Sequence, residues 1–155
     1  MKKLNIALVA HDARKKELRE WCYYNRHRLV DHNLFATGTT AKILHGIGLE
    51  DMPEGLHVNQ LLSGPLGGDQ QIGAMIAEGK IDILIFFCDN LIKQGHQQDV
   101  GALVRLASLY NIGFATNRTT ADMLLTSPLF GNEEYERIIP SSIDDYVKRN
   151  VYNKL

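Results

Sequence analysis

Residues 61–87, LLSGPLGGDQQIGAMIAEGKIDILIFF, decide the fold. A glycine-rich turn (63–68), a segment of helical composition (69–80) and an apolar run (82–87) follow one another directly. The apolar run does not alternate with polar residues, which is typical of a strand covered by helices on both faces. The succession of turn, helix and buried strand predicts an α/β protein built on a parallel sheet.

The rest of the chain repeats this alternation on both sides of that stretch. We predict strands at the apolar, β-rich runs 4–10, 29–37, 57–62, 82–87, 112–116 and 137–140. Segments with helical spacing or composition lie between or after them, at 13–28, 40–48, 69–80, 100–110, 119–127 and 142–152. The alternating order predicts a doubly wound sheet with right-handed crossovers, and the length predicts a single domain over residues 1–155.

Composition narrows the class of protein. The net charge of -1 provides no basic field of the kind that nucleic-acid binders use. The start MKKLNIALVA is broken by Asn5 and is too short for a signal peptide, and no apolar stretch approaches the roughly 20 residues of a membrane span. Cys22 and Cys88 lack metal-binding spacing, so we expect two free thiols in a reducing cytoplasm.

Small, polar or glycine-rich residues follow the predicted strands. In a parallel sheet the carboxyl ends of the strands share one edge, and ligands bind there. The residues expected at that edge are His11, Asp12 and Lys15; Thr37, Gly38, Thr39 and Thr40; Ser63, Gly64 and Asp69; Asp89 with His96 and Asp99; and Thr116 with Asn117. We expect these loops to form the binding site.

The run TGTT (37–40) suits a phosphate group. Its glycine lets backbone N–H groups approach a ligand, its threonines add hydroxyl donors, and a helix beginning there adds unpaired N–H groups. The plainer alternative is that Thr39 only caps that helix.

The turn SGPLGGDQQ (63–71) carries Asp69 at its end. Asp69 can act as the N-cap of the next helix, but the preceding glycines exceed what a cap requires, and they favour close approach of backbone to a ligand. Lys15 is either a phosphate counter-charge or a solvated lysine. His11 is a donor or a partly buried histidine, and His96 is an acid–base group or a surface histidine.

The other histidines fall within helix or strand patterns, and we interpret them as structural or solvated: His27, His32, His45 and His57. No HxxxH or DxD spacing supports a metal site. The residues alone therefore predict an anion cradle, a carboxylate on a glycine turn and nearby histidines, with a small phosphorylated metabolite as ligand.

Four runs resemble the methylglyoxal synthase family: IALVAHDARK (6–15), LFATGTT (34–40), LLSGPLGGDQQIGAMIAEGKIDILIFFCD (61–89) and RLASLYNIGFATNRTTAD (105–122). The similarity covers nearly the whole chain, and SGPLGGDQQIGA is long and specific. It implies a flavodoxin-like sheet of five parallel strands in a cytoplasmic homohexamer. It further implies an enzyme that converts dihydroxyacetone phosphate to methylglyoxal and inorganic phosphate without metal or organic cofactor, and that phosphate inhibits.

The resemblance also implies a role for each candidate residue. Asp69 matches the catalytic base, His96 the histidine that orients the substrate oxygens, and Asp99 an acidic residue close to the site. His11 and Lys15 match substrate-binding residues, with Lys15 near the phosphate. The phosphate cradle matches Thr37, Gly38, Thr39, Thr40, Ser63 and Gly64, and the supporting residues are Asp12 and Asp89.

The sequence departs from the family around Asp89. Cys88 and Asn90 stand where family members have tryptophan and proline, and the loop LIKQGHQQDV (91–100) lacks proline. The expected placement of His96 therefore depends on a loop that differs from the family pattern.

Two other functions suit a domain of this kind. The same fold serves as a non-catalytic module that binds phosphorylated effectors in large synthetases such as carbamoyl phosphate synthetase. Such a module needs only the cradle, whereas this chain also carries Asp69 and His96. A receiver-type signalling domain requires an acidic cluster after the first strand, which Asp12 and Asp89 resemble only loosely.

Overall fold

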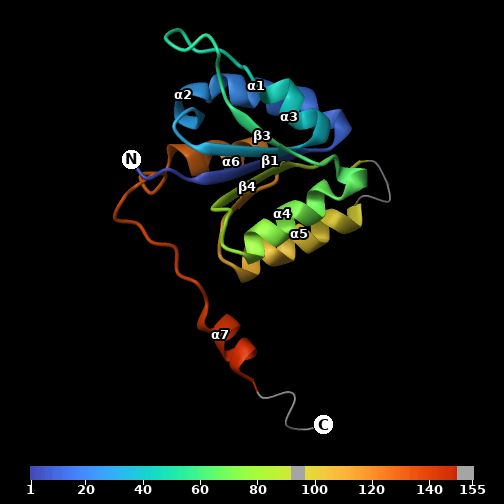
Figure 1. Ribbon diagram of the computed structural model, residues 1–155, viewed down its shortest axis with the longest axis vertical. Helices are drawn as coiled ribbons and strands as arrows, with labels where there is room; N and C mark the ends of the chain where they lie inside the picture. Colours follow the sequence, from blue (N-terminus) through green and yellow to red (C-terminus); the bar gives the residue numbers. More distant parts are fainter. Residues whose placement is uncertain (92–96, 150–155) are drawn as a thin grey trace.

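The computed structural model describes residues 1–91 and 97–149 and contains a five-stranded sheet in the order β3-β2-β1-β4-β5 (Figure 1). The strands are β1 (Asn5–Ala10), β2 (Asn33–Thr37), β3 (Val58–Leu61), β4 (Ile83–Phe87) and β5 (Gly113–Ala115). Each neighbouring pair in this sheet is parallel. The predicted doubly wound α/β fold is confirmed.

Helices connect the strands and cover both faces of the sheet (Figure 1). One face carries α1 (Lys15–Tyr24), α2 (Arg26–Leu29), α3 (Gly38–Leu44) and α6 (Arg118–Thr126), and the other carries α4 (Gly68–Ala77) and α5 (Gln97–Leu109). Two short 3-10 turns, η1 (Asp12–Arg14) and η2 (Gly64–Leu66), precede α1 and α4.

The central strand β1 shows why both faces need a helical layer. Ile6 and Leu8 join the core beneath α1, whereas Ala7 and Val9 join the core beneath α4. Successive side chains of a strand point to opposite faces, so a strand that is apolar at every position must be covered twice. This is the arrangement that the unbroken apolar runs predict.

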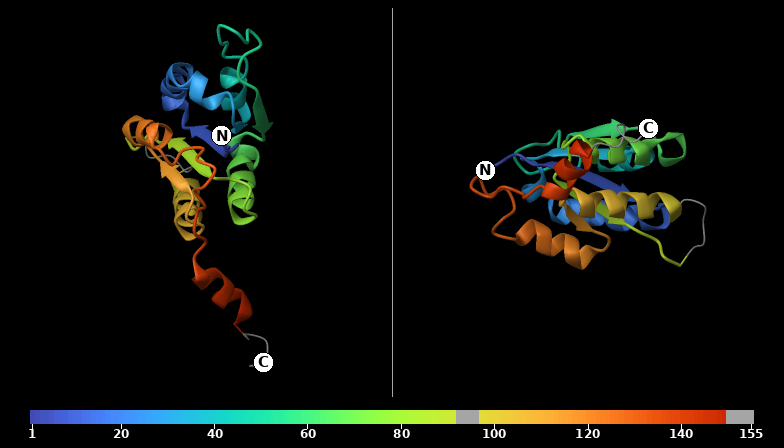
Figure 2. Two further views of the ribbon diagram at one scale, coloured as in Figure 1. Left: turned by 90° about the vertical axis from the view of Figure 1, so that its left-hand side faces the viewer. Right: turned by 90° about the horizontal axis from the view of Figure 1, so that it is seen from below.

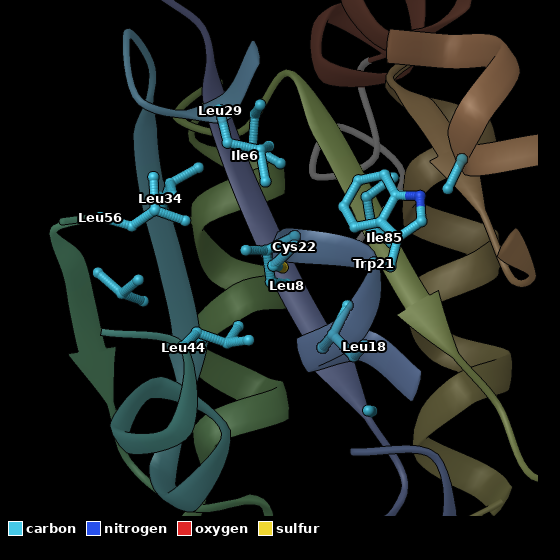
Figure 3. Close-up of a cluster of buried hydrophobic side chains, with 14 of the residues drawn as sticks. Ile6, Leu8, Leu18, Trp21, Cys22, Leu29, Leu34, Leu44, Leu56 and Ile85 are labelled. Carbon is cyan, nitrogen blue, oxygen red and sulfur yellow. The ribbon is translucent and has the colours of Figure 1, made fainter. Parts of the chain in front are cut away.

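Trp21 ties α1 to α6 and to the sheet. Its side chain is fully buried, and its indole N–H donates a hydrogen bond to Asp122 Oδ1 at 2.8 Å. The ring meets Phe87 edge-on, with the centroids 6.0 Å apart, and Figure 3 shows it in the same buried cluster as Leu18, Cys22 and Ile85. Burial raises the pKa of the Cys22 thiol, which keeps the sulfur protonated and unreactive.

Four predicted elements differ clearly from those observed. The predicted helix 40–48 begins at Gly38 and ends at Leu44. Residues 137–140 form no strand, since the backbone carbonyl of Ile138 accepts from the Asn111 side chain instead of pairing with a strand. The predicted strand 29–37 begins only at Asn33, because Leu29 enters the core from the end of α2. The predicted helix 13–28 is divided at Asn25, whose side-chain amide donates to the Trp21 carbonyl.

Residues 138–149 form an arm that leaves the body of the molecule. Its helix α7 (Ser141–Lys148) stands off the sheet in Figures 1 and 2 and buries none of its side chains. Ile138 and Val147 are more than three-quarters exposed, at 77% and 76%. Among the described helices, none has the length and apolar character that a bilayer crossing requires.

We expect His32 to make the stability of this fold pH-dependent. It is buried, its Nδ1 accepts the Leu4 N–H at 3.0 Å, and its Nε2 is buried with no hydrogen-bond partner among the described residues. Burial lowers the pKa of His32, against an opposing effect of Asp31. As the pH falls, the unfolded chain therefore protonates this histidine before the folded protein does. The stability that neutral His32 contributes to the fold is full above about pH 6.5, the ordinary value for histidine, and it is lost as the pH falls below that value.

We expect His32→Asn, whose amide oxygen can still accept the Leu4 N–H, to weaken the loss of unfolding free energy between pH 7.5 and pH 5. Urea denaturation at both pH values measures this loss. The exposed His57 provides the matched control, His57→Asn, which should keep the wild-type pH dependence. An unchanged pH dependence in His32→Asn would show that another group is responsible.

Candidate active site

The carboxyl ends of β1, β2 and β3 meet at a pocket of about 260 Å³. The predicted residues from three separate loops line this one pocket: His11, Asp12, Lys15, Thr37, Gly38, Thr39, Thr40, Ser63, Gly64 and Asp69. Val9, Ala10, Pro65 and Phe86 also line it. The structure therefore brings the three predicted loops together.

The loop after β2 enters α3 without an intervening turn. Thr37 is the N-cap in extended conformation, and Gly38 is the first helical residue. Thr39 therefore lies inside the first turn, and the alternative that it caps the helix is wrong. Backbone N–H groups of a first helical turn have no partner within the helix. The Gly38 N–H is bonded to the Leu62 carbonyl outside the helix, whereas Thr39 and Thr40 follow it in the same turn and line the pocket, where their N–H groups suit a phosphate.

Two glycines allow the loops to approach each other backbone to backbone. Gly38 has a φ of 35°, and a side-chain carbon on it would lie 2.7 Å from the Ser63 Cα. A side-chain carbon on Gly68 would lie 2.0 Å from the Leu62 carbonyl oxygen. Both contacts are shorter than any side chain tolerates, so glycine at these two positions sets the shape of the cradle.

Lys15 is directed into the pocket. Its Nζ donates to Asp12 Oδ1 at 2.5 Å and to Thr39 Oγ1 at 2.9 Å, and its side chain is 25% exposed. The alternative of a freely solvated lysine is therefore wrong. Held beside the first turn of α3, the ammonium group supplies positive charge where the backbone donors converge. Asp12 thus contacts Lys15 directly, and its supporting role stays a prediction.

His11 links the ends of β1 and β4. Its backbone N–H donates to the Phe87 carbonyl, and its ring Nδ1 accepts the backbone N–H of Asp89 at 2.8 Å. The ring also packs edge-on against Phe86, with the centroids 5.1 Å apart. An Nδ1 that accepts a hydrogen bond leaves the proton of a neutral imidazole on Nε2, so His11 is arranged as a donor. The Asp89 carboxylate accepts the Leu91 N–H, a structural role.

Asp69 lies in the first turn of α4 and directly follows the glycine-rich turn 63–68. Gly67, in the left-handed region at a φ of 107°, is the N-cap of that helix, so the alternative that Asp69 is the cap is wrong. The Asp69 carboxylate is close to Ser63–Gly64, which we call the phosphate loop because the sequence predicts phosphate contacts there. A side-chain carbon on Gly64 would lie 3.7 Å from Asp69 Oδ2. A carboxylate and an anion cradle therefore border the same small pocket.

The remaining candidates are His96, Asp99, Thr116 and Asn117. His96 lies outside the described residues, and Asp99 falls in the first turn of α5, where the backbone alone is described. Asn117 caps α6 through the Thr120 N–H and does not line this pocket, and neither does Thr116. Phe86 was missed as a site residue because its run is typical of a core strand.

Comparisons with known proteins identify relatives that match over most of the chain. Residues 22–116 match the MGS-like domain family. A methylglyoxal synthase from Proteus mirabilis is 57% identical over 135 residues, covering 86% of this chain and 84% of its own. The chain belongs to the methylglyoxal synthase family.

Further members of the methylglyoxal synthase family match over similar lengths. One from Pseudoalteromonas translucida is 51% identical over 146 residues, covering 94% of this chain and 88% of its own. The crystal structure of methylglyoxal synthase from Elizabethkingia anophelis superposes with a TM-score of 0.82 at 46% identity, covering 96% of this chain and 93% of that one. The family and the fold that the sequence resemblance implies are thus confirmed.

We expect Gly68→Ala to weaken both the fold and the cradle, because the added methyl group would overlap the Leu62 carbonyl. Overpacking of this kind costs about 1–3 kcal/mol of unfolding free energy, and the displaced loop should bind inorganic phosphate less tightly. Urea denaturation and titration calorimetry with phosphate measure the two effects.

Gly101→Ala in α5 is the matched control, since the space around Gly101 is open. There alanine should stabilise the helix by about 0.5–1 kcal/mol. If the two variants had equal stability and equal affinity for phosphate, the cradle would not depend on the Gly68 contact.

Proposed function

We propose that this protein converts dihydroxyacetone phosphate to methylglyoxal and inorganic phosphate, as a lyase that breaks the carbon–oxygen bond to the phosphate. The observation that carries the proposal is the Asp69 carboxylate beside a cradle built from Gly38, Gly64 and Lys15 in one pocket. Family membership supports it, because the matched relatives bear the name methylglyoxal synthase.

Asp69 acts as the general base in this proposal. It takes a proton from C3 of the bound substrate, and the electron pair moves toward the C2 carbonyl to form an enediolate. Such a base contributes about 10²–10⁴-fold to the rate. Because a carboxylate is a weak base for a carbon acid, hydrogen-bond donors must stabilise the developing oxyanion. His11 is arranged as such a donor, and we assign His96 the same task.

The enediolate must then lose phosphate and not regain a proton at C2. Elimination requires the C1–O bond to the phosphate to stand perpendicular to the enediolate plane, so that the π electrons of the enediolate can enter the antibonding orbital of that bond while its bonding pair leaves with the phosphate. The first turn of α3 and Ser63–Gly64 would fix that torsion from two sides. Lys15 would stabilise the charge on the departing phosphate. The product enol then becomes methylglyoxal by tautomerisation.

An effector-binding module is the second function that this fold supports. Such a module needs the cradle and Lys15, and it does not require a carboxylate next to the phosphate loop. The proximity of Asp69 to Gly64 therefore favours the enzyme. Asp69 can still bind a ligand hydroxyl group in a module, so activity distinguishes the two.

We also propose that the protein is a cytoplasmic homohexamer that inorganic phosphate inhibits. The free thiols of Cys22 and Cys88 suit a reducing compartment. The arm supports association of subunits, because Ile138 and Val147 are largely exposed and an eight-residue helix is marginal in water on its own. Phosphate competes with the substrate for the same cradle in this proposal.

We expect Asp69→Asn to retain the fold and to lower kcat by about 10²–10⁴-fold, because the amide removes the base and keeps the shape. A coupled assay for methylglyoxal measures the rate, and circular dichroism checks the fold. A variant that keeps near wild-type turnover would exclude Asp69 as the base.

We expect Lys15→Ala to raise the KM for the triose phosphate and the inhibition constant for phosphate together, since both ligands place a phosphate beside the Lys15 ammonium. The exposed neighbouring Lys16 gives the matched control, Lys16→Ala, which should leave both constants near wild type. Unchanged phosphate inhibition in Lys15→Ala would show that Lys15 does not contact the phosphate.

A further inference from the structure

The backbone N–H and carbonyl of Leu62 join the segment after β3 to α4 and to the first turn of α3. Leu62 directly follows β3, and its side chain is half exposed. Its N–H donates to Gln71 Oε1 at 2.8 Å, and its carbonyl oxygen accepts the Gly38 N–H at 3.2 Å. The backbone of Leu62 therefore connects α4 on one side with the first turn of α3 on the other.

The segment after Leu62 is held to α4 by backbone contacts. The Ser63 carbonyl accepts the Gly68 N–H at 3.0 Å, and the Leu62 carbonyl packs against Gly68. At the Leu62 N–H, by contrast, a side chain makes the bond. Gln71 is the residue whose substitution can release this junction while leaving its backbone contacts in place.

Gln71 is well placed to fix the base relative to the phosphate loop. It lies two residues after Asp69 on α4, and its own N–H is bonded to the Gly67 carbonyl at 3.0 Å, inside the regular first turns of the helix. One rigid element thus carries both the carboxylate and the amide that holds Leu62. The phosphate-binding Ser63 and Gly64 follow Leu62 directly.

We propose that Gln71 is a positioning residue that sets the distance between the phosphate cradle and the Asp69 carboxylate. It touches neither the substrate nor the reacting atoms, and it acts through Leu62. The effect on phosphate binding stands by itself, whereas the effect on turnover rests on the proposed function. Misplacement of a substrate by about 1 Å can cost 10²-fold in rate, so a single bond at this junction can affect catalysis.

Three variants test the proposal. Gln71→Met keeps the length and flexibility of the side chain and removes the acceptor. Gln71→Glu keeps an oxygen that can accept the Leu62 N–H. Gln70→Met, at the exposed preceding position, is the matched control. The measurements are the dissociation constant for inorganic phosphate by calorimetry, kcat and KM, hydrogen exchange of the Leu62 amide, and the melting temperature.

In Gln71→Met we expect faster exchange of the Leu62 amide and phosphate binding weakened by about three- to tenfold, the effect of one hydrogen bond. The value of kcat should fall as well, with little change in melting temperature. Gln71→Glu should restore the slow amide exchange and most of kcat, and Gln70→Met should match wild type.

Wild-type phosphate affinity and kcat in Gln71→Met would overturn the proposal, as would an equal loss in Gln70→Met. A lower melting temperature with unchanged phosphate affinity and kcat would also overturn it, because Gln71 would then be structural only. If wild-type protein binds phosphate and makes no methylglyoxal, the proposed function fails, and the phosphate affinity of Gln71→Met still decides the role of Gln71.

Discussion

The contact between Gly68 and the Leu62 carbonyl is the constraint on which the site depends. A methyl group on Gly68 would lie 2.0 Å from that oxygen, and one on Gly38 would lie 2.7 Å from the Ser63 Cα. These two contacts let three chain segments meet with no side chains between them. Backbone N–H groups of α3, the phosphate loop and the first turn of α4 can therefore surround a ligand as small as a triose phosphate.

The sheet explains why this convergence is stable. β1 lies at the centre of the sheet and is covered by a helical layer on each face, and β2 and β4 hold it on either side. The pocket thus rests on a rigid core, with Lys15 and His11 held by Asp12, Thr39 and the Asp89 backbone. Side chains fixed in this way need little reorganisation when charge develops in a transition state.

Much of this arrangement follows from the sequence, because parallel strands expose their loops at one edge. The unbroken run 82–87 predicted the sheet, and the TGTT and SGPLGGD segments predicted where a ligand lies. The features that the sequence did not reveal depend on contacts between distant residues. The proton position on His11 depends on an amide 78 residues away, and residues 137–140 have apolar β-rich composition but find no strand partner.

The most direct test of the proposed lyase activity is a product analysis of dihydroxyacetone phosphate incubated with the purified protein and a chelator. Methylglyoxal, inorganic phosphate and glyceraldehyde 3-phosphate would be quantified together. We expect methylglyoxal and phosphate in equal amounts without the isomerised triose phosphate, because in the proposed mechanism the cradle orients the C1–O bond for elimination. Formation of glyceraldehyde 3-phosphate, or tight phosphate binding with no turnover, would contradict it.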